Sequence, residues 1–177
     1  MSIRTSFNPL GTLGKVEFLE EVSITKGVSV PSVFTSWSDL DDVETALTCR
    51  IESFTQGQDP FSLMPNNASA ARYKFNFWDG RLYVANNTLG GYIMPYLDGV
   101  KTLMLDRRGV SVDGEFFFSC PNGHAWDGAA SSFTIAKQRF SKFTIKRNGV
   151  LLAEWRAARL NGEDGIFDTV SKQFKVV

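Results

Sequence analysis

Residues 120–128 carry side chains that could bind a carbohydrate. Trp126 lies there beside Asn122, His124 and Asp127. An aromatic ring can stack on a sugar ring while amide, imidazole and carboxylate groups bond its hydroxyls, and small-ligand sites combine an apolar wall with a few polar groups in this way. We therefore expect a glycan-binding loop here. The alternative is that Trp126 only caps an edge of the fold.

Two other tryptophans have clear interpretations. Trp37 lies between Ser36 and Ser38 and is the second candidate for stacking on a sugar, with packing inside the fold as the alternative. Trp155 follows the apolar pair Leu151-Leu152, so we expect it in the core.

A serine hydrolase would have to be built around His124, the single histidine. Asp127 and either Ser131 or Ser132 could complete a Ser-His-Asp set. The sequence has no Gly-x-Ser-x-Gly elbow, no Gly-rich phosphate loop and no Cys/His zinc spacing. We interpret His124 as a loop residue and expect no catalytic residue.

An acidic cluster could bind calcium. Calcium takes about 6–8 oxygen ligands, several of them carboxylates, and Asp39, Asp41, Asp42 and Glu44 could supply some. The cluster lacks the glycine of an EF-hand loop. We expect no cofactor, with calcium as the one ion that could bind. The alternative is a solvated acidic turn.

Composition restricts the class of partner. The chain has 177 residues, with 19 Lys and Arg against 19 Asp and Glu, so its net charge is zero. A nucleic-acid or anionic-membrane partner would call for a basic excess, so we expect neither. The sequence has no apolar run of membrane-span length, and its start does not resemble a signal peptide. Its two cysteines are too few for a disulfide scaffold.

Turn signals predict an all-β fold. Eight glycines follow Asp or Asn, a pair that tolerates the positive φ of tight hairpins, and we interpret seven of these pairs as hairpin turns. These pairs are Asp79-Gly80, Asp98-Gly99, Asp113-Gly114, Asn122-Gly123, Asp127-Gly128, Asn148-Gly149 and Asn161-Gly162. Several are flanked by alternating apolar and polar residues, at the spacing typical of β-sandwiches and barrels.

Two segments leave a helix open. Ser38 and Asp39 could cap a short helix over residues 40–47. Residues 151–160 contain good helix formers, but we predict a strand there because they follow an Asn-Gly hairpin signal.

The first residues differ from the rest. Residues 1–14 contain Pro9 and Gly11 and show no strand pattern, so we interpret them as an extended N-terminal arm, with one domain over residues 15–177. A segment without its own core needs a partner to order it. We expect the arm to anchor the protein to a particle through Arg4, Phe7, Pro9 and Leu10.

Five segments carry a family resemblance. Residues 16–20, 75–83, 105–114, 143–151 and 165–174 resemble, in order, the strands and hairpins of laminin-G-like, concanavalin A-like modules of phage and prophage virion proteins. The last two are similar to an ending that reads FKIYDNGVL…GLYDTVSGKF. The resemblance implies a two-sheet antiparallel jelly-roll sandwich, and homo-oligomers in phage appendages.

The C-terminal motif also has a physical interpretation. Gly165 would allow a tight bend, Ile166 and Val170 would point into the core, and Phe174 would close one edge. Asp168 would bond nearby backbone amides and hold a corner, rather than bind a ligand.

Three functions follow from the resemblance. We expect a non-catalytic virion protein, in a capsid decoration or tail fibre, made in the bacterial cytoplasm and displaying a lectin-like domain for host-surface or mucosal glycans. The first alternative is a purely structural cement module without a ligand. A glycan hydrolase is the least favoured, because β-glucanases of this fold arrange their carboxylates as Glu-x-Asp-x-x-Glu and this sequence has no such motif.

Overall fold

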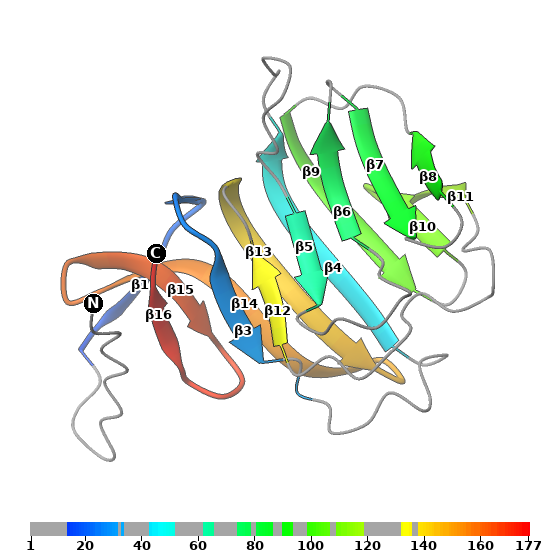
Figure 1. Ribbon diagram of the computed structural model, residues 1–177. Coiled ribbons are helices and arrows are strands. Elements are labelled where there is room, and N and C mark those ends of the chain that lie inside the picture. The colour runs from blue at the N-terminus through cyan, green and yellow to red at the C-terminus, as the bar shows by residue number, and fades with distance from the viewer. Residues whose placement is uncertain are drawn as a thin grey trace.

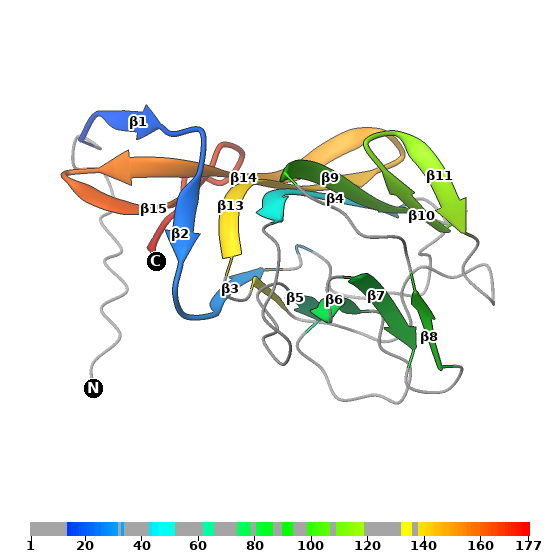
Figure 2. The same ribbon diagram turned by 90° about the horizontal axis from the view of Figure 1, so that it is seen from above.

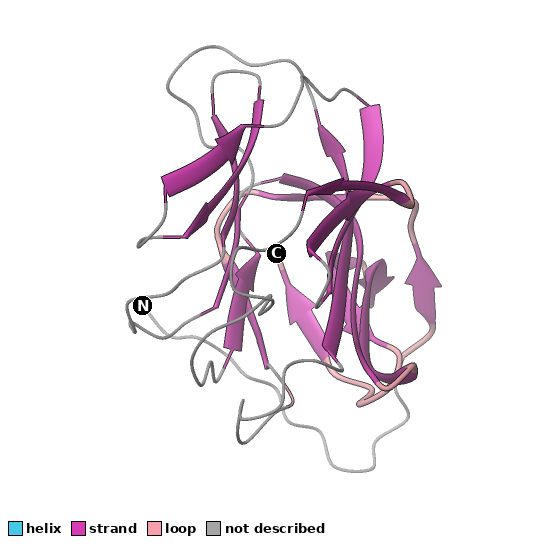
Figure 3. Cartoon of the chain, turned by 90° about the vertical axis from the view of Figure 1, so that its right-hand side faces the viewer, coloured by secondary structure: helices cyan, strands magenta, loops and turns pink. Residues whose placement is uncertain are grey.

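The described part of the chain is all-β. The computed structural model describes residues 14–31, 33, 43–51, 62–65, 74–78, 81–86, 90–93, 99–106, 109–118, 132–135 and 138–177, and every regular element in these ranges is a strand (Figure 3). The predicted fold class is confirmed at this level. Among these residues no helix is long and apolar enough to cross a membrane.

Sixteen strands form two sheets in the described ranges, and every strand pair is antiparallel (Figure 1). The larger sheet runs in the order β11 (Glu115–Phe118), β10 (Gly109–Val112), β9 (Gly99–Asp106), β4 (Val43–Ile51), β13 (Gln138–Arg147), β14 (Val150–Leu160), β15 (Glu163–Asp168) and β16 (Phe174–Val176). Here β1 (Val16–Phe18) also pairs with β14, and β2 (Val22–Ile24) with β13. The smaller sheet runs in the order β3 (Val28–Pro31), β12 (Ser132–Ile135), β5 (Ser62–Pro65), β6 (Lys74–Trp78), β7 (Arg81–Asn86) and β8 (Gly90–Ile93). Figure 2 shows the two sheets as two layers.

The predicted tight turns join consecutive strands of the larger sheet. Asp113 and Gly114 have φ of 51° and 86° between β10 and β11, and Asn148 and Gly149 have φ of 49° and 75° between β13 and β14. The Asn161-Gly162 turn between β14 and β15 has the same left-handed pair. Positive φ at both central residues matches the right-handed twist of the flanking strands, so these turns fix the register of the hairpins.

The helix considered over residues 40–47 is wrong for its described part. Val43–Ile51 is the strand β4, with Val43, Thr45 and Leu47 buried and the residues between them half-buried. This alternation has a period of two, and pairing with β9 and β13 on both sides favours a strand over the local capping signal. The strand predicted over residues 151–160 is confirmed as part of β14.

The core lies on the inner face of the larger sheet. Its largest fully buried side chains are Leu47, Leu103, Phe140, Phe143 and Trp155, so the expected burial of Trp155 is confirmed. The same cluster includes Val30 of β3 and Ile135 of β12, which belong to the smaller sheet. The core therefore joins the two layers through side chains of both sheets.

The N-terminal arm lies outside the described residues except for its last position. A side chain at Gly14 would collide with the side chain of Asn161 in the β14–β15 turn. The chain therefore enters β1 beside the tip of that hairpin, and only glycine allows so close an approach.

Candidate functional site

The residues predicted to bind ligands or anchor the protein lie outside the described residues. These residues are Arg4, Phe7, Pro9, Leu10, Trp37, Asp39, Asp41, Asp42, Asn122, His124, Trp126 and Asp127. The structure does describe the strands that flank their segments, and these strands fix where each segment starts and ends.

The strands that flank Trp37 and Trp126 in the smaller sheet are neighbours. The segment with Trp37 follows β3, and the segment with Trp126 precedes β12. Pro31, the last residue of β3, pairs with Ser132, the first residue of β12. Both segments are therefore attached to the same end of this strand pair.

The segments with Trp37 and Trp126 are both attached to the same end of the larger sheet. The segment with Trp37 leads into Val43 of β4, and the segment with Trp126 follows Phe118 of β11. One row of paired residues connects these places, from Thr45 through Leu105 and Val110 to Phe118. Both segments thus cross between the sheets from one end of the larger sheet to one end of the β3–β12 pair.

Glu44 is the one described member of the acidic cluster. Its carboxylate accepts a hydrogen bond from Lys146 Nζ at 2.9 Å across the β4–β13 pair, and the two side chains are 31% and 39% exposed. Glu44 is therefore engaged in an ion pair. The described ranges contain no group of three or more His, Cys, Asp or Glu residues that could hold a metal ion.

Asp168 forms a buried corner at the end of β15. Its Oδ1 accepts hydrogen bonds from the backbone N–H of Glu154 at 2.9 Å and of Val170 at 3.2 Å. Its Oδ2 accepts from the N–H of Ser171 at 3.1 Å and from the Ser171 hydroxyl. Asp168 is 2% exposed, and these bonds fit the expected structural role.

Other details of this motif differ from expectation. Ile166 is buried as predicted, but Val170 is 44% exposed, because the turn after Asp168 points it outward. Gly165 lies within β15 rather than at a bend, and a Cβ there would meet the Phe174 ring at 2.5 Å and the carbonyl oxygen of Lys175. Its role is to let the Phe174 ring lie across the sheet.

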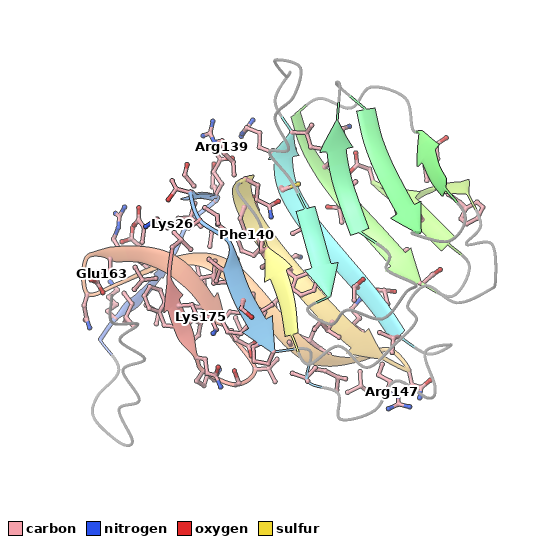
Figure 4. All side chains as sticks on the ribbon, in the orientation of Figure 1. Lys26, Arg139, Phe140, Arg147, Glu163 and Lys175 are labelled. Atoms are coloured by element: carbon pink, nitrogen blue, oxygen red, sulfur yellow. The ribbon has the colours of Figure 1, made fainter. Side chains whose placement is uncertain are left out.

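A carboxylate joins three strands of the larger sheet. Glu21, just before β2, accepts a hydrogen bond from Arg50 Nε of β4 at 2.8 Å and is also paired with Arg139 of β13. The Glu21 side chain is only 17% exposed. Figure 4 labels Arg139 at the upper end of β13. Because Glu21 follows β1 closely, this pairing ties the first strands of the chain to the centre of the sheet.

The outer side of the larger sheet carries an aromatic surface at one end. Residues directly opposite each other in antiparallel strands lie on the same face. One row contains Phe18, Ala158, Gly165 and Val176, and the next contains Arg156, Phe167 and Phe174. We call this surface the aromatic face; its apolar members are Val16, Phe18, Leu160, Phe167, Phe174 and Val176.

Contacts within the aromatic face are specific. The rings of Phe18 and Phe167 meet edge to face with centroids 6.1 Å apart, and the Arg156 guanidinium lies 4.4 Å from the centroid of Phe18. Phe167 is 5% exposed, whereas Phe18 and Val176 are 45% and 56% exposed. The aromatic face therefore rests on the buried Phe167 ring, while Phe18 and Val176 remain accessible to solvent.

Sequence reasoning missed the aromatic face as a surface. Its phenylalanines belong to three strands, β1, β15 and β16, and only the strand register brings them together. The one available signal was that Phe18, Phe167 and Phe174 all lie in segments that carry the resemblance.

The chain was compared with known proteins in three ways. A scan against protein-family models, a search of curated proteins and a search of solved structures each found no match.

Proposed function

We propose that the chain is a non-catalytic structural protein of a phage particle, with a concanavalin A-like jelly roll that presents a glycan-binding end. The N-terminal arm anchors it to the particle, in a homo-oligomer. Two layered antiparallel sheets joined by crossovers support this fold, because jelly rolls are built in this way.

The C-terminal corner supports the proposed family. Lys172 has a φ of 61°, in the left-handed region that favours glycine. In the ending that this chain resembles, glycine occupies the matching position. The left-handed conformation of Lys172 is therefore the one that the glycine of the resembled ending would favour, and it supports a shared corner structure.

One observation carries the proposal of a glycan site. The segments with Trp37 and Trp126 are attached to the smaller sheet at Pro31 and Ser132, which pair with each other. Their other attachments, to β4 and β11, lie at the same end of the larger sheet. Two tryptophans on neighbouring crossovers would supply stacking surfaces, with Asn122, His124 and Asp127 as hydrogen-bonding groups. We propose that these crossovers form one site.

A glycan array tests this function. The purified full chain is screened beside Trp126→Ala and the control Val100→Thr, which changes a side chain that is 48% exposed on β9. We expect binding to a restricted set of glycans, lost by at least about tenfold in Trp126→Ala, as expected for removal of a central aromatic contact, and kept in the control. Repeating the screen with a chelator tests whether calcium contributes.

Other outcomes favour the alternatives. A folded wild-type protein that binds no glycan would contradict the lectin role and favour a structural cement module. Release of cleaved glycan from the array would favour a hydrolase. Equal loss of binding in Trp126→Ala and Val100→Thr would show that the crossover is not the site.

A further inference from the structure

We infer that the aromatic face is a docking site for the N-terminal arm of a second copy of this chain. The inference rests on the proposed anchoring role of the arm, and it names the arm's partner. Four observations carry it: the exposure of the face, the place where the arm begins, the composition of the arm, and its length.

The face exposes apolar side chains on a firm support. Phe18 and Val176 are about half exposed, and Leu160 and Phe174 are partly exposed. Gly165 lets the Phe174 ring lie close to the β15 backbone, because any side chain there would displace it. A rigid apolar surface loses little conformational entropy when it is covered, which favours binding.

The arm of each chain begins at the border of its own aromatic face. Gly14 lies against Asn161 at the tip of the β14–β15 hairpin, two residues before Val16. Because β1 runs antiparallel to β14, Gly14 lies beyond Val16, beside the hairpin tip at Asn161. The arm therefore starts at the hairpin tip, where a neighbouring subunit can approach it.

The arm matches the face in polarity and charge. Residues 1–13 include Ile3, Phe7, Leu10 and Leu13, and their single charged side chain is Arg4. On the face, Glu163 lies in the row with Val16 and Leu160 and is exposed (labelled in Figure 4). Glu163 forms no ion pair with any described residue. The arm is apolar like the face, and its one cation can pair with the Glu163 carboxylate. The one cation of the face, Arg156, already lies over the Phe18 ring.

The arm is long enough to reach a second copy. Thirteen residues span at most about 43–47 Å when fully extended. A compact domain of this size has a radius of gyration of about 16 Å, hence a diameter of roughly 40 Å. An arm can therefore cross a subunit in contact with its own. The exchange closes between two copies or around a ring.

The test is self-association of the full chain, measured by sedimentation velocity over a range of concentrations. We expect the wild type to associate. We expect Phe18→Ser, which alters the face, and the double variant Phe7→Ser/Leu10→Ser, which alters the arm, each to weaken association by about tenfold or more. Val176→Ser is a second face variant in case Phe18→Ser unfolds. Val100→Thr lies off the face and should associate like the wild type.

Mixing the two kinds of variant makes the test specific. The Phe18→Ser chain keeps an intact arm, and the Phe7→Ser/Leu10→Ser chain keeps an intact face. Differently tagged, they should form a mixed complex more tightly than either forms with itself. Failure of the mixture to associate would overturn the inference.

Two further results would also overturn it. If the arm variant associates like the wild type, two faces pair with each other and the arm is not the occupant. If the wild type is monomeric at every concentration, the second copy is not the partner. Incorporation of such a monomer into particles would leave the anchoring role intact and contradict only the proposed homo-oligomer, so failure of this inference can be told apart from failure of the anchoring role.

Discussion

Single residues set the geometry of the turns. Asp113 does so both by its left-handed backbone conformation and by the interactions of its charged side chain. Its side chain accepts a hydrogen bond from the Thr102 N–H at 2.9 Å and pairs with Lys101 Nζ at 3.0 Å. Partial burial raises the pKa of Asp113, but the Thr102 hydrogen bond and the Lys101 charge outweigh it, so the pKa lies below the usual 3.8. The folded state therefore favours the ionised carboxylate.

This lowered pKa predicts a dependence of stability on pH. A carboxyl with a lower pKa in the folded state stabilises the protein above its unfolded pKa, and this contribution disappears as the pH falls through the folded pKa. Asp113→Asn keeps a residue that tolerates the left-handed turn but loses the ion pair. We expect the variant to melt about 1–3 °C below the wild type at pH 7, because exposed pairs contribute little.

Thermal melting from pH 7 to pH 2 checks this prediction. The difference in Tm between wild type and Asp113→Asn should shrink as the pH falls below 3.8. A difference that stays constant over this range would contradict the assigned role of the carboxylate.

At the scale of elements, the packing of β15 against β16 depends on Gly165. A Cβ at this position would meet the Phe174 ring at 2.5 Å and the Lys175 carbonyl oxygen. We expect Gly165→Ala to lower the free energy of unfolding by about 2–3 kcal/mol, because overpacking forces side chains and backbone to shift. Urea denaturation measures the change.

Phe174→Ala provides the control for this contact. In that background the penalty of Gly165→Ala should be smaller but not zero, because the clash with the Lys175 backbone remains. Equal penalties in both backgrounds would show that the Phe174 ring does not press on Gly165.

Local signals predicted the hairpins well and the roles of some residues poorly. The three turns whose residues the structure describes, at 113–114, 148–149 and 161–162, were identified because their chemistry lies within two residues. Gly165 was interpreted as a bend because its close neighbour Phe174 is brought to it only by strand pairing. Residues 40–47 were considered as a helix because their pairing partners, β9 and β13, are distant in sequence. The aromatic face could not be predicted for the same reason.

At the scale of the whole molecule, Cys49 reports on how often the core opens. Its side chain is fully buried in β4, and burial raises the pKa of the thiol to about 12. Because the thiolate is the reactive species, the folded protein should protect Cys49 from alkylation. In a Cys120→Ser variant, we expect labelling at pH 8 to be slower than in the unfolded chain by several orders of magnitude.

Mass spectrometry at increasing urea concentration follows this labelling. The rate should rise with urea in parallel with global unfolding, since Cys49 belongs to a buried cluster that contains side chains of both sheets. Rapid labelling of the native protein without urea would contradict the central position of Cys49.

The pairing of β1 with β14 has a consequence for biosynthesis. Val16 at the base of the arm finds its partner, Leu160, only after every described strand from β2 to β14 has been synthesised. Closing such a long loop is slow, so contacts of this kind form late on the ribosome. A nascent or prematurely terminated chain lacks the β14–β15 hairpin against which Gly14 rests. The start of the arm is therefore held in place only on subunits that have been translated through the β14–β15 hairpin, so incomplete chains cannot present the arm from this position.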